Sequence, residues 1–254
     1  MKILIGCAKD MSQTSNARPR LVSEPMFKEQ ATANALQMTR YDAEEIADML
    51  GCNTQIANDN LLRYRHFADP DKGLQSLLAY TGIVFKYIAP ESFTTYDFAY
   101  AQKHLLITSF LYGLLRPMDE IKCYRMEGNV KLPDNDKTMF DYWKPFLTDT
   151  LIDAVNSDGG TLVDIASKEM RRLFDWRKVE KKIRVIRPEF YVSRGGRLRT
   201  IVIYSKMCRG AMARYLIKER ISAPSKLRDF SFEGFTYNTS DSTPDRPIYV
   251  QEQP

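Results

Sequence analysis

Lys2-Ile-Leu-Ile-Gly-Cys7, at the start of the chain, is the stretch that decides the fold. It is apolar, contains β-branched residues and ends at small residues, which predicts a short buried strand. A second run of the same kind, Thr161-Leu-Val-Asp-Ile-Ala166, follows much later in the chain. Helical and strand signals both occur between and after these runs. We therefore expect a mixed α/β fold with a central mixed sheet flanked by helices.

Helical signals dominate up to about residue 100. Asp42-Ala-Glu-Glu45 has the form of a capping box, and Gly51 ends the helix that it starts. The residue pattern fits a strand or a helix end at residues 105–110. Further helices are predicted over residues 53–66, 74–88, 95–105 and 138–157.

Strand and helix signals alternate in the second half. Ser167 is expected to cap a helix that runs to about residue 178. Two β-rich runs, residues 182–192 and 197–205, are joined by Ser193-Arg-Gly-Gly196, which predicts a late β-hairpin. A helix is predicted over residues 206–221. The polar tail, residues 236–254, contains three prolines and is expected to be partly disordered.

The chain contains no internal repeat and no low-complexity linker, so one domain over residues 1–254 is the economical interpretation. A small helical lobe at residues 42–100, standing out from that domain, is the alternative. The N-terminal apolar run is only about five residues long, too short for a secretory signal. No stretch approaches the roughly 20 apolar residues of a membrane span. We expect a cytoplasmic protein with no membrane partner.

The cysteines and histidines argue against a disulfide-stabilised protein and against a zinc protein. The four cysteines have irregular spacing and form no CxxC pair, so reduced thiols are expected, with no disulfide framework. His66 and His104 are the only histidines, and neither is near a cysteine in the sequence. We expect no zinc site, no other metal and no cofactor.

Positive charge is concentrated late in the chain. Residues 168–228 hold 19 Lys and Arg against 5 acidic residues, an excess of 14 positive charges. The other 193 residues hold 18 basic and 27 acidic residues, an excess of 9 negative charges. Such asymmetry indicates a polyanionic partner.

The predicted helix at residues 206–221 separates an apolar stripe from its charges. Residues 208, 211, 212, 215 and 216 follow helical spacing and are expected to face the core. The basic residues that fall off that stripe are Lys206, Arg209, Arg214, Lys218 and Arg220. These cations suit contact with phosphates, and an ordinary solvated helix face is the alternative.

The predicted hairpin is also basic. Its tip and strands carry Lys181, Lys182, Arg184, Arg187, Arg194, Arg197 and Arg199. Arginine outnumbers lysine, and arginine is the better bidentate phosphate ligand. The hairpin therefore suits contact with a phosphate backbone. The alternative is that its charges keep an exposed edge strand from pairing with another chain.

Catalytic motifs are absent from the sequence. The candidate nucleophiles Cys7, Ser109 and Ser167 have no histidine or acid at a recognisable motif spacing. Cys7 follows a strand near Lys9, which suits a lowered thiol pKa, but a buried inert thiol is favoured. There is no GxGxxG and no P-loop. Whether the protein is an enzyme stays open, and a non-enzyme is favoured.

The chain nonetheless resembles one known family over nearly its whole length, the YaaA family of bacterial peroxide-stress proteins. The order and spacing of eight blocks carry the resemblance. They are Lys2-Ile-Leu-Ile with Ala8-Lys9; Phe98-Ala-Tyr-Ala-Gln-Lys-His-Leu105; Leu111-Tyr-Gly-Leu-Leu-Arg-Pro-Met-Asp119; Tyr124-Arg-Met-Glu127; Phe140-Asp-Tyr-Trp143; Ile165-Ala-Ser167 with Glu169; Tyr204-Ser-Lys-Met-Cys-Arg-Gly-Ala-Met-Ala-Arg214; and Phe232-Glu-Gly-Phe235.

The sequence departs from the family pattern in places. Gly6-Cys7 stands where the family commonly shows Ser-Pro, and Phe110 stands where a glycine is common. Asp164 and Met170 replace the usual asparagine and tyrosine.

The resemblance implies a cytosolic protein that supports survival of hydrogen peroxide and limits damage driven by iron. It also implies DNA binding, an unusual α/β fold, a basic cleft and a helix-hairpin-helix-like element, which we place at residues 111–119. A tight packed turn is the alternative there. The charged positions that match family blocks are Lys9, Arg116, Arg125, Lys206, Arg209 and Arg214.

Double-stranded or branched DNA is accordingly the expected partner. We expect its phosphates to be bound by these residues together with Lys218 and Arg197. The rival hypothesis is an enzyme that acts on a small anionic metabolite or nucleotide in a pocket formed by Lys9, Tyr112, Arg116, Arg125, Ser167, Glu169, Lys206 and Arg209. Direct iron sequestration has little support, because the sequence holds no His/Glu cluster at ligand spacing.

Overall fold

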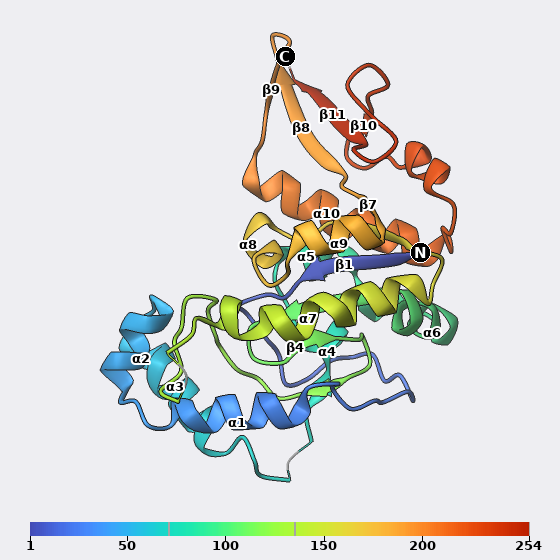
Figure 1. The fold of residues 1–254 in the computed structure, drawn as a ribbon. Helices are drawn as coiled ribbons and strands as arrows, with labels where there is room; N and C mark the ends of the chain where they lie inside the picture. The colour runs from blue at the N-terminus through green and yellow to red at the C-terminus, as the bar shows by residue number, and fades with distance from the viewer. Residues whose placement is uncertain (71, 135, 254) are drawn as a thin grey trace.

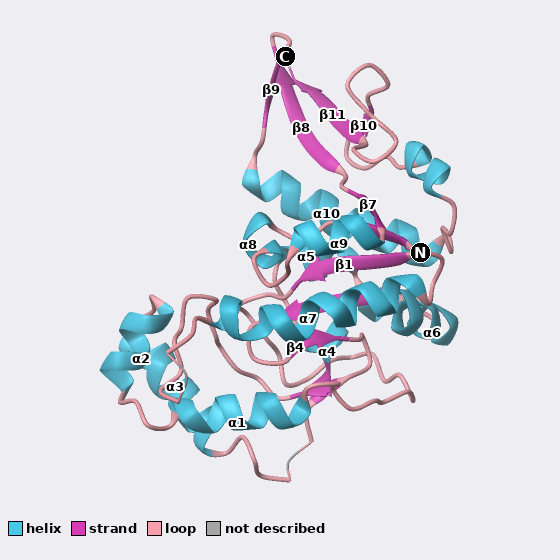
Figure 2. Ribbon diagram, viewed as in Figure 1, coloured by secondary structure: helices cyan, strands magenta, loops and turns pink. Residues whose placement is uncertain are grey.

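A computed structural model describes residues 1–70, 72–134 and 136–253 (Figures 1 and 2). The helices are α1 (Lys28–Met38), α2 (Ala43–Leu50), α3 (Thr54–Arg65), α4 (Ser76–Ala79), α5 (Ile83–Ile88), α6 (Thr95–His104), α7 (Met139–Asn156), α8 (Lys168–Arg171), α9 (Trp176–Lys182) and α10 (Val202–Lys218), with 3-10 turns η1 (Pro90–Ser92) and η2 (Pro224–Asp229). The strands are β1 (Lys2–Gly6), β2 (Leu74–Gln75), β3 (Leu105–Ser109), β4 (Gly113–Leu115), β5 (Glu120–Ile121), β6 (Thr161–Asp164), β7 (Arg184–Ile186), β8 (Glu189–Arg194), β9 (Arg197–Arg199), β10 (Thr236–Tyr237) and β11 (Ile248–Gln253).

A five-stranded sheet in the order β4-β3-β1-β6-β7 forms the centre of the molecule. The strands β3, β1, β6 and β7 run parallel to one another, and the edge strand β4 is antiparallel to β3. Ile3 pairs with Leu105 on one side and with Val163 on the other, so the opening stretch of the chain is the middle strand. The predicted mixed α/β fold is confirmed.

Helices pack around this sheet in two groups. α7 packs with α9, β4 and β6, and α10 packs with α5 and α6. All five residues of β3 are buried, as expected for a strand covered on both faces. Trp143 of α7 is fully buried, and its indole Nε1 donates a hydrogen bond to the Phe110 carbonyl at 2.7 Å. That bond ties α7 to the turn between β3 and β4.

A second sheet, in the order β10-β11-β8-β9, lies beyond α10. The predicted late hairpin is confirmed as β8–β9, with Gly195 and Gly196 both at positive φ in its turn. The predicted disorder of the tail is wrong, because residues 248–253 form β11 parallel to β8. Ile248, Tyr249 and Val250 are buried there, and this short apolar run outweighs the polar residues around it.

Several predicted helix boundaries also change. The expected helix at residues 74–88 is divided into β2, α4 and α5, because Tyr80 is extended and its hydroxyl hydrogen-bonds that of Tyr124 at 2.7 Å. The expected helix after Ser167 is divided into α8 and α9, and Asp175 caps the second. α10 begins at Val202, four residues earlier than predicted, and β9 is correspondingly short.

Other local predictions hold. The Asp42 capping box and the left-handed Gly51 bound α2, and Asn53 caps α3. The apolar stripe of α10 is buried at Cys208, Met212 and Leu216. None of the described helices is long and apolar enough to cross a membrane.

Gly210 is where α10 and α5 approach each other most tightly, and its replacement is a test of this packing. An added Cβ would lie 2.2 Å from the Val84 carbonyl oxygen and 2.7 Å from the Tyr87 Cβ. A Gly→Ala change inside a helix ordinarily stabilises it by about 1 kcal/mol. Here we expect Gly210→Ala to lower the free energy of unfolding by about 1–3 kcal/mol, because backbone atoms must move.

Urea denaturation followed by circular dichroism measures this change. Lys206→Ala, at an exposed position of the same helix, is the control and is expected to stay within about 0.5 kcal/mol. A Gly210→Ala protein that is as stable as the native chain would contradict the tight approach.

Candidate functional site

The carboxyl edge of the parallel sheet is the natural place for a site. The chain leaves β1 for its neighbour β3 and later returns to β6 on the opposite side of β1. The connections therefore diverge between β1 and β6, and open α/β sheets bind ligands outside the strand ends at such a point. In Figure 1 this edge faces left, toward α8 and the first turns of α7 and α10.

A small cavity of about 30 Å³ lies at this point. Lys9 follows β1, and its Nζ is 2.8 Å from the Glu127 Oε1. The Arg125 Nε is 3.6 Å from the same oxygen, so two cations share one carboxylate. The cavity is lined by Cys7, Ala8, Lys9, Phe110, Tyr124, Arg125, Met126, Glu127, Glu169 and Met170. Its volume suits a water molecule and no substrate.

Cys7 reaches this cavity as a neutral thiol. Burial raises the pKa of the Cys7 thiol to about 12, and the nearby carboxylates of Glu127 and Glu169 also raise it. The Lys9 ammonium pairs with Glu127. The raised thiol pKa favours the interpretation of Cys7 as an inert thiol over that of an activated nucleophile.

Asp164, the last residue of β6, forms ion pairs with two arginines. Its carboxylate is fully buried, and its Oδ2 lies 2.7 Å from the Arg171 Nε and 3.2 Å from the Arg187 Nε. Its Oδ1 accepts a hydrogen bond from the Ala166 amide at 3.1 Å. Burial raises the pKa of this carboxyl group above its ordinary value, even though the two arginines oppose the shift.

Arg209 of α10 faces the same group. Burial is the main cause that lowers the pKa of the Arg209 guanidinium, and the neighbouring Arg171 lowers it further. Asp164 partly compensates for both effects. One buried carboxylate thus holds cations from α8 and from the segment after β7, and it acts electrostatically on a third cation from α10.

A cationic hollow of about 270 Å³ opens next to this network. It is lined by Phe140, Asp141, Lys144, Lys168, Arg171, Arg172, Phe174 and Trp176. Four of these residues are basic and only Asp141 is acidic. The Arg172 guanidinium lies 3.8 Å from the centre of the Phe140 ring, which fixes it by a cation–π contact. We call these eight residues the cationic hollow.

The short helix α8 connects the two places. Its N-cap is the Ser167 hydroxyl, which accepts from the Met170 amide. Glu169 and Met170 line the small cavity, whereas Lys168 and Arg171 line the cationic hollow. Residues of one helical turn after β6 therefore line both places.

The structure brings together only some of the residues predicted as a site. Lys9 and Arg125 share the small cavity, and Arg209 joins the Asp164 network at the same edge. Lys206 is exposed, one turn before Arg209 on α10. Arg197 lies on the exposed strand β9, opposite Arg194 in the hairpin.

The other predicted residues make internal bonds elsewhere. Arg116 forms an ion pair with the buried Asp119 at 2.9 Å. Arg214 donates to the Ile88 and Ala89 carbonyls and to the Ser92 hydroxyl, which places it on the end of α5. Lys218 pairs with Asp97 at 2.8 Å. These three cations hold the fold together in the structure.

The sequence did not single out Lys144, Lys168, Arg171 or Arg172. A usable signal existed, since Lys168-Glu-Met-Arg-Arg172 directly follows a buried strand and a capping serine. No sequence signal pointed to Lys144, because only the packing of α7 brings this residue to the same hollow. Asp164 appeared only as a departure from the family pattern.

The groups that the rival enzyme hypothesis requires do not meet in one pocket. The Tyr112 hydroxyl accepts a hydrogen bond from the Lys122 amide, and Arg116 pairs with Asp119. Both therefore lie apart from Lys9 and Glu169, which share the small cavity. Within residues 1–70, 72–134 and 136–253, no three His, Cys, Asp or Glu side chains form a group suited to a metal ion.

The placement of a helix-hairpin-helix-like element at residues 111–119 is wrong. This stretch contains β4, which forms a β-hairpin with β3. Gly113 has a φ of 74° and lies against the Trp143 ring, which explains the glycine in that block. Two packed helices joined by a short glycine turn occur instead at α2 and α3.

Comparison with known proteins gives one consistent result. A family model described as "Peroxide stress protein YaaA" matches residues 1–241. A UPF0246 protein of Phocaeicola vulgatus is 50% identical over 245 residues, which covers 96% of each chain. UPF0246 proteins of Bacteroides thetaiotaomicron and Porphyromonas gingivalis are 46% and 43% identical and cover 98% and 99% of this chain, and 98% and 100% of their own.

Proposed function

Because this chain belongs to the family of the peroxide stress protein YaaA, we propose that it serves the oxidative stress response by binding double-stranded or branched DNA in the cytoplasm. The proposed contact is with phosphates, at the carboxyl edge of the five-stranded sheet. The chain's late excess of positive charge supports a polyanionic partner of this kind.

The cationic hollow is the observation that carries this proposal. Lys144, Lys168, Arg171 and Arg172 surround it with a single acidic residue among them. Lys168 and Arg172 are exposed, so a phosphate can reach them without rearrangement. Asp164 holds Arg171 in place, and the Phe140 ring holds Arg172. Arginines held in this way lose little side-chain entropy when they bind a phosphate.

The helical hairpin α2–α3 is a second candidate contact. Gly51 takes a left-handed φ of 56° after α2, and Asn53 then starts α3. A turn of this form directs backbone amides at the start of a helix toward solvent, where they suit a phosphate. In Figure 1 this hairpin lies on the same left-hand side as α8. We place the family's helix-hairpin-helix-like element here.

Recognition would depend mainly on the backbone of the DNA. The residues of the cationic hollow come from α7, α8, the segment between α8 and α9, and the first residue of α9. Contacts to phosphates position a protein on DNA but carry no sequence information. We expect weak sequence preference and strong dependence on salt.

Charge reversal in the cationic hollow tests this function. We expect Lys144→Glu with Lys168→Glu to weaken binding of a fluorescent duplex by about 10- to 100-fold at low salt. The native chain should show a steep fall of affinity with salt, and the variant a slope that is smaller by about 2 on the log–log plot, one for each lost contact. Fluorescence anisotropy over a salt series measures both quantities.

The matched control is Lys181→Glu with Lys182→Glu. These residues are exposed and give the same change in net charge, but they end α9 and do not line the cationic hollow. The control should bind DNA nearly as well as the native chain. Equal losses in the two variants would reduce the effect to net charge, and absence of binding by the native chain at low salt would overturn the function.

A further inference from the structure

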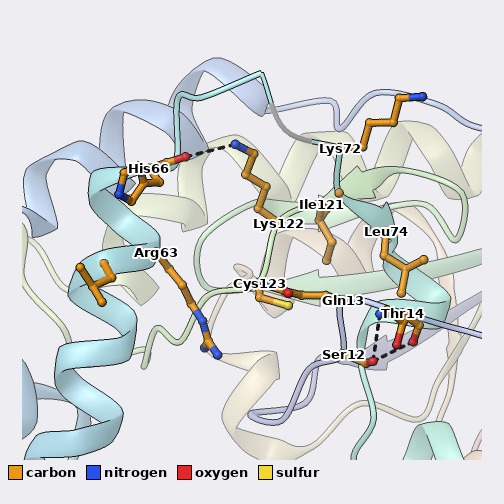
Figure 3. A pocket seen from close by; sticks show the side chains of 12 residues that line it. Ser12, Gln13, Thr14, Arg63, His66, Lys72, Leu74, Ile121, Lys122 and Cys123 are labelled. Carbon is orange, nitrogen blue, oxygen red and sulfur yellow. Dashed lines mark hydrogen bonds between the residues drawn. The ribbon is translucent and has the colours of Figure 1, made fainter.

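A larger cavity, of about 580 Å³, has no part in the proposed DNA contact. It lies between the end of α3, the loop after β1 and the β2–β5 pair (Figure 3). Its described lining residues are Ser12, Gln13, Thr14, Leu62, Arg63, His66, Lys72, Gly73, Leu74, Ile121, Lys122 and Cys123. Ligand sites commonly have volumes of about 300–1,000 Å³, so this one has room for a small molecule.

Positive charge dominates its described lining. Arg63, Lys72 and Lys122 are cationic, and none of the described lining residues is acidic. The His66 Nδ1 is hydrogen-bonded to the Asp69 carboxylate at 2.8 Å. In Figure 3 the Arg63 side chain extends from α3 past Cys123, whereas the Lys122 amine points the opposite way, toward His66, and the Lys72 amine lies on the far side of the view.

Two hydrogen bonds hold the Lys122 ammonium in place. Its ammonium donates to the His66 carbonyl at 3.2 Å and to the Asp69 carbonyl at 2.6 Å. An ammonium has three N–H donors, so one remains for a ligand. The two carbonyls come from the end of α3 and the turn that follows, and they fix the amine relative to Arg63 on the same helix.

The rest of the lining is apolar or neutral and polar. Leu74 of β2 and Ile121 of β5 are cross-strand neighbours and form one apolar wall. The Ser12 hydroxyl makes two hydrogen bonds with the Thr14 backbone. It donates to the carbonyl at 2.7 Å and accepts from the amide at 3.1 Å. That turn leaves the Gln13 amide and the Thr14 hydroxyl for other partners. Such a lining suits a ligand with an anionic end and a less polar body.

We propose that this cavity binds a phosphomonoester of about mononucleotide size, with the phosphate near Arg63 and the body against Leu74 and Ile121. The Arg63 guanidinium is directed along α3 toward Asn60, to whose Oδ1 it donates at 3.3 Å, whereas the Lys122 ammonium at the other end of the cavity adds to the positive potential. A phosphomonoester carries close to two negative charges at neutral pH and several acceptor oxygens. Arginine binds such a group through paired hydrogen bonds, and lysine adds a point charge. Free nucleotides and the 5′-phosphate at a DNA end share this chemistry.

The inference does not depend on the proposed DNA contact. Arg63 lies nine residues after Thr54, so about 14 Å of helix separates the cavity from the hairpin turn before α3. The cationic hollow is built from α7, α8 and residues 172, 174 and 176, none of which lines this cavity.

Isothermal titration calorimetry with adenosine 5′-monophosphate, adenosine and inorganic phosphate tests the site at low salt. We expect saturable one-to-one binding of the monophosphate. Adenosine and inorganic phosphate should each bind at least about tenfold more weakly, because each lacks half of the contacts. Arg63→Gln should lower the affinity for the monophosphate by about tenfold or more, and Lys122→Gln should lower it by a smaller factor.

Arg65→Gln is the matched control, since Arg65 is exposed on the same helix and does not line the cavity. It should bind the monophosphate as the native chain does. No saturable heat with the native chain, adenosine binding as tight as the monophosphate, or equal losses in Arg63→Gln and Arg65→Gln would each overturn the site.

Two DNA duplexes distinguish the sources of the phosphate. A duplex with 5′-phosphates that displaces the monophosphate, while a 5′-hydroxyl duplex does not, assigns the site to DNA ends. Displacement by neither assigns it to free nucleotides. Equal displacement by both would place the cavity on the general DNA path and overturn the phosphomonoester site. Arg63→Gln should keep the native affinity for 5′-hydroxyl duplex, and Lys144→Glu with Lys168→Glu should keep that for the monophosphate, so either proposal can fail alone.

Discussion

Asp164→Ala is expected to lower the free energy of unfolding by about 3–5 kcal/mol, the usual result of removing one partner from a buried ion pair. Asp164 is fully buried, and its carboxylate contacts Arg171 at 2.7 Å and Arg187 at 3.2 Å. The change also removes the acceptor for the Ala166 amide. Several donors at the end of β6 then lose their partner together.

The isosteric change Asp164→Asn should cost less than Asp164→Ala, but it still removes the negative charge that pairs with Arg171 and Arg187. An asparagine keeps the shape and the acceptor for the Ala166 amide. Urea denaturation followed by tryptophan fluorescence measures all variants, with Asp149→Ala at an exposed ion pair as the control. Equal stability of Asp164→Ala and the native chain would show that the arginines do not need this carboxylate.

Asp97→Asn is expected to destabilise the protein by about 2–4 kcal/mol at pH 7, because it leaves two cations without their carboxylate. Asp97 is buried at the start of α6, where it pairs with Lys218 at 2.8 Å and with Arg220 at 2.9 Å. It also accepts from the Thr94 amide and hydroxyl, both at 2.9 Å. Lys218 and Arg220 come from the end of α10 and from the residues after it, so this network fastens α10 to α6.

The pH dependence has a definite sign. Burial alone would raise the pKa of the Asp97 carboxyl group, but the bonds from Lys218, Thr94 and Arg220 outweigh it and lower the pKa below its ordinary value. The stabilisation is therefore complete above the unfolded pKa of about 4, and it is lost as the pH falls below that value toward the folded pKa.

Thermal melts from pH 7 down to about pH 2 measure this effect, since the unfolded pKa lies near 4. The native chain should lose stability across the acid range, and Asp97→Asn should show a flatter profile there. Asp229→Asn, at an exposed pair with Lys226, is the control and should follow the native profile. A native-like acid slope in Asp97→Asn would assign the acid sensitivity to other carboxyl groups.

Much of the fold could be predicted where local signals decide. The apolar runs of β1 and β6, the capping box before α2 and the glycine turn of the β8–β9 hairpin depend on neighbours in the sequence. The tail was mispredicted because the stability of β11 comes from pairing with β8 and from the contact of Tyr249 with Phe190. Residues 74–88 were mispredicted because Tyr80 bonds to Tyr124, which is distant in the sequence.

For the candidate site, too, the sequence determined some features and the tertiary structure determined the others. By itself the sequence determined the family, the mixed α/β class and a segment with excess positive charge, since composition and ordered motifs need no coordinates. Only the tertiary structure decided which cations face outward. Arg116, Arg214 and Lys218 are bound to Asp119, to α5 and to Asp97, whereas Lys144 and Lys168, 24 residues apart, meet in one hollow. The physical reason is that a charge is neutralised by whatever lies within a few ångströms, and those distances are set by packing between elements.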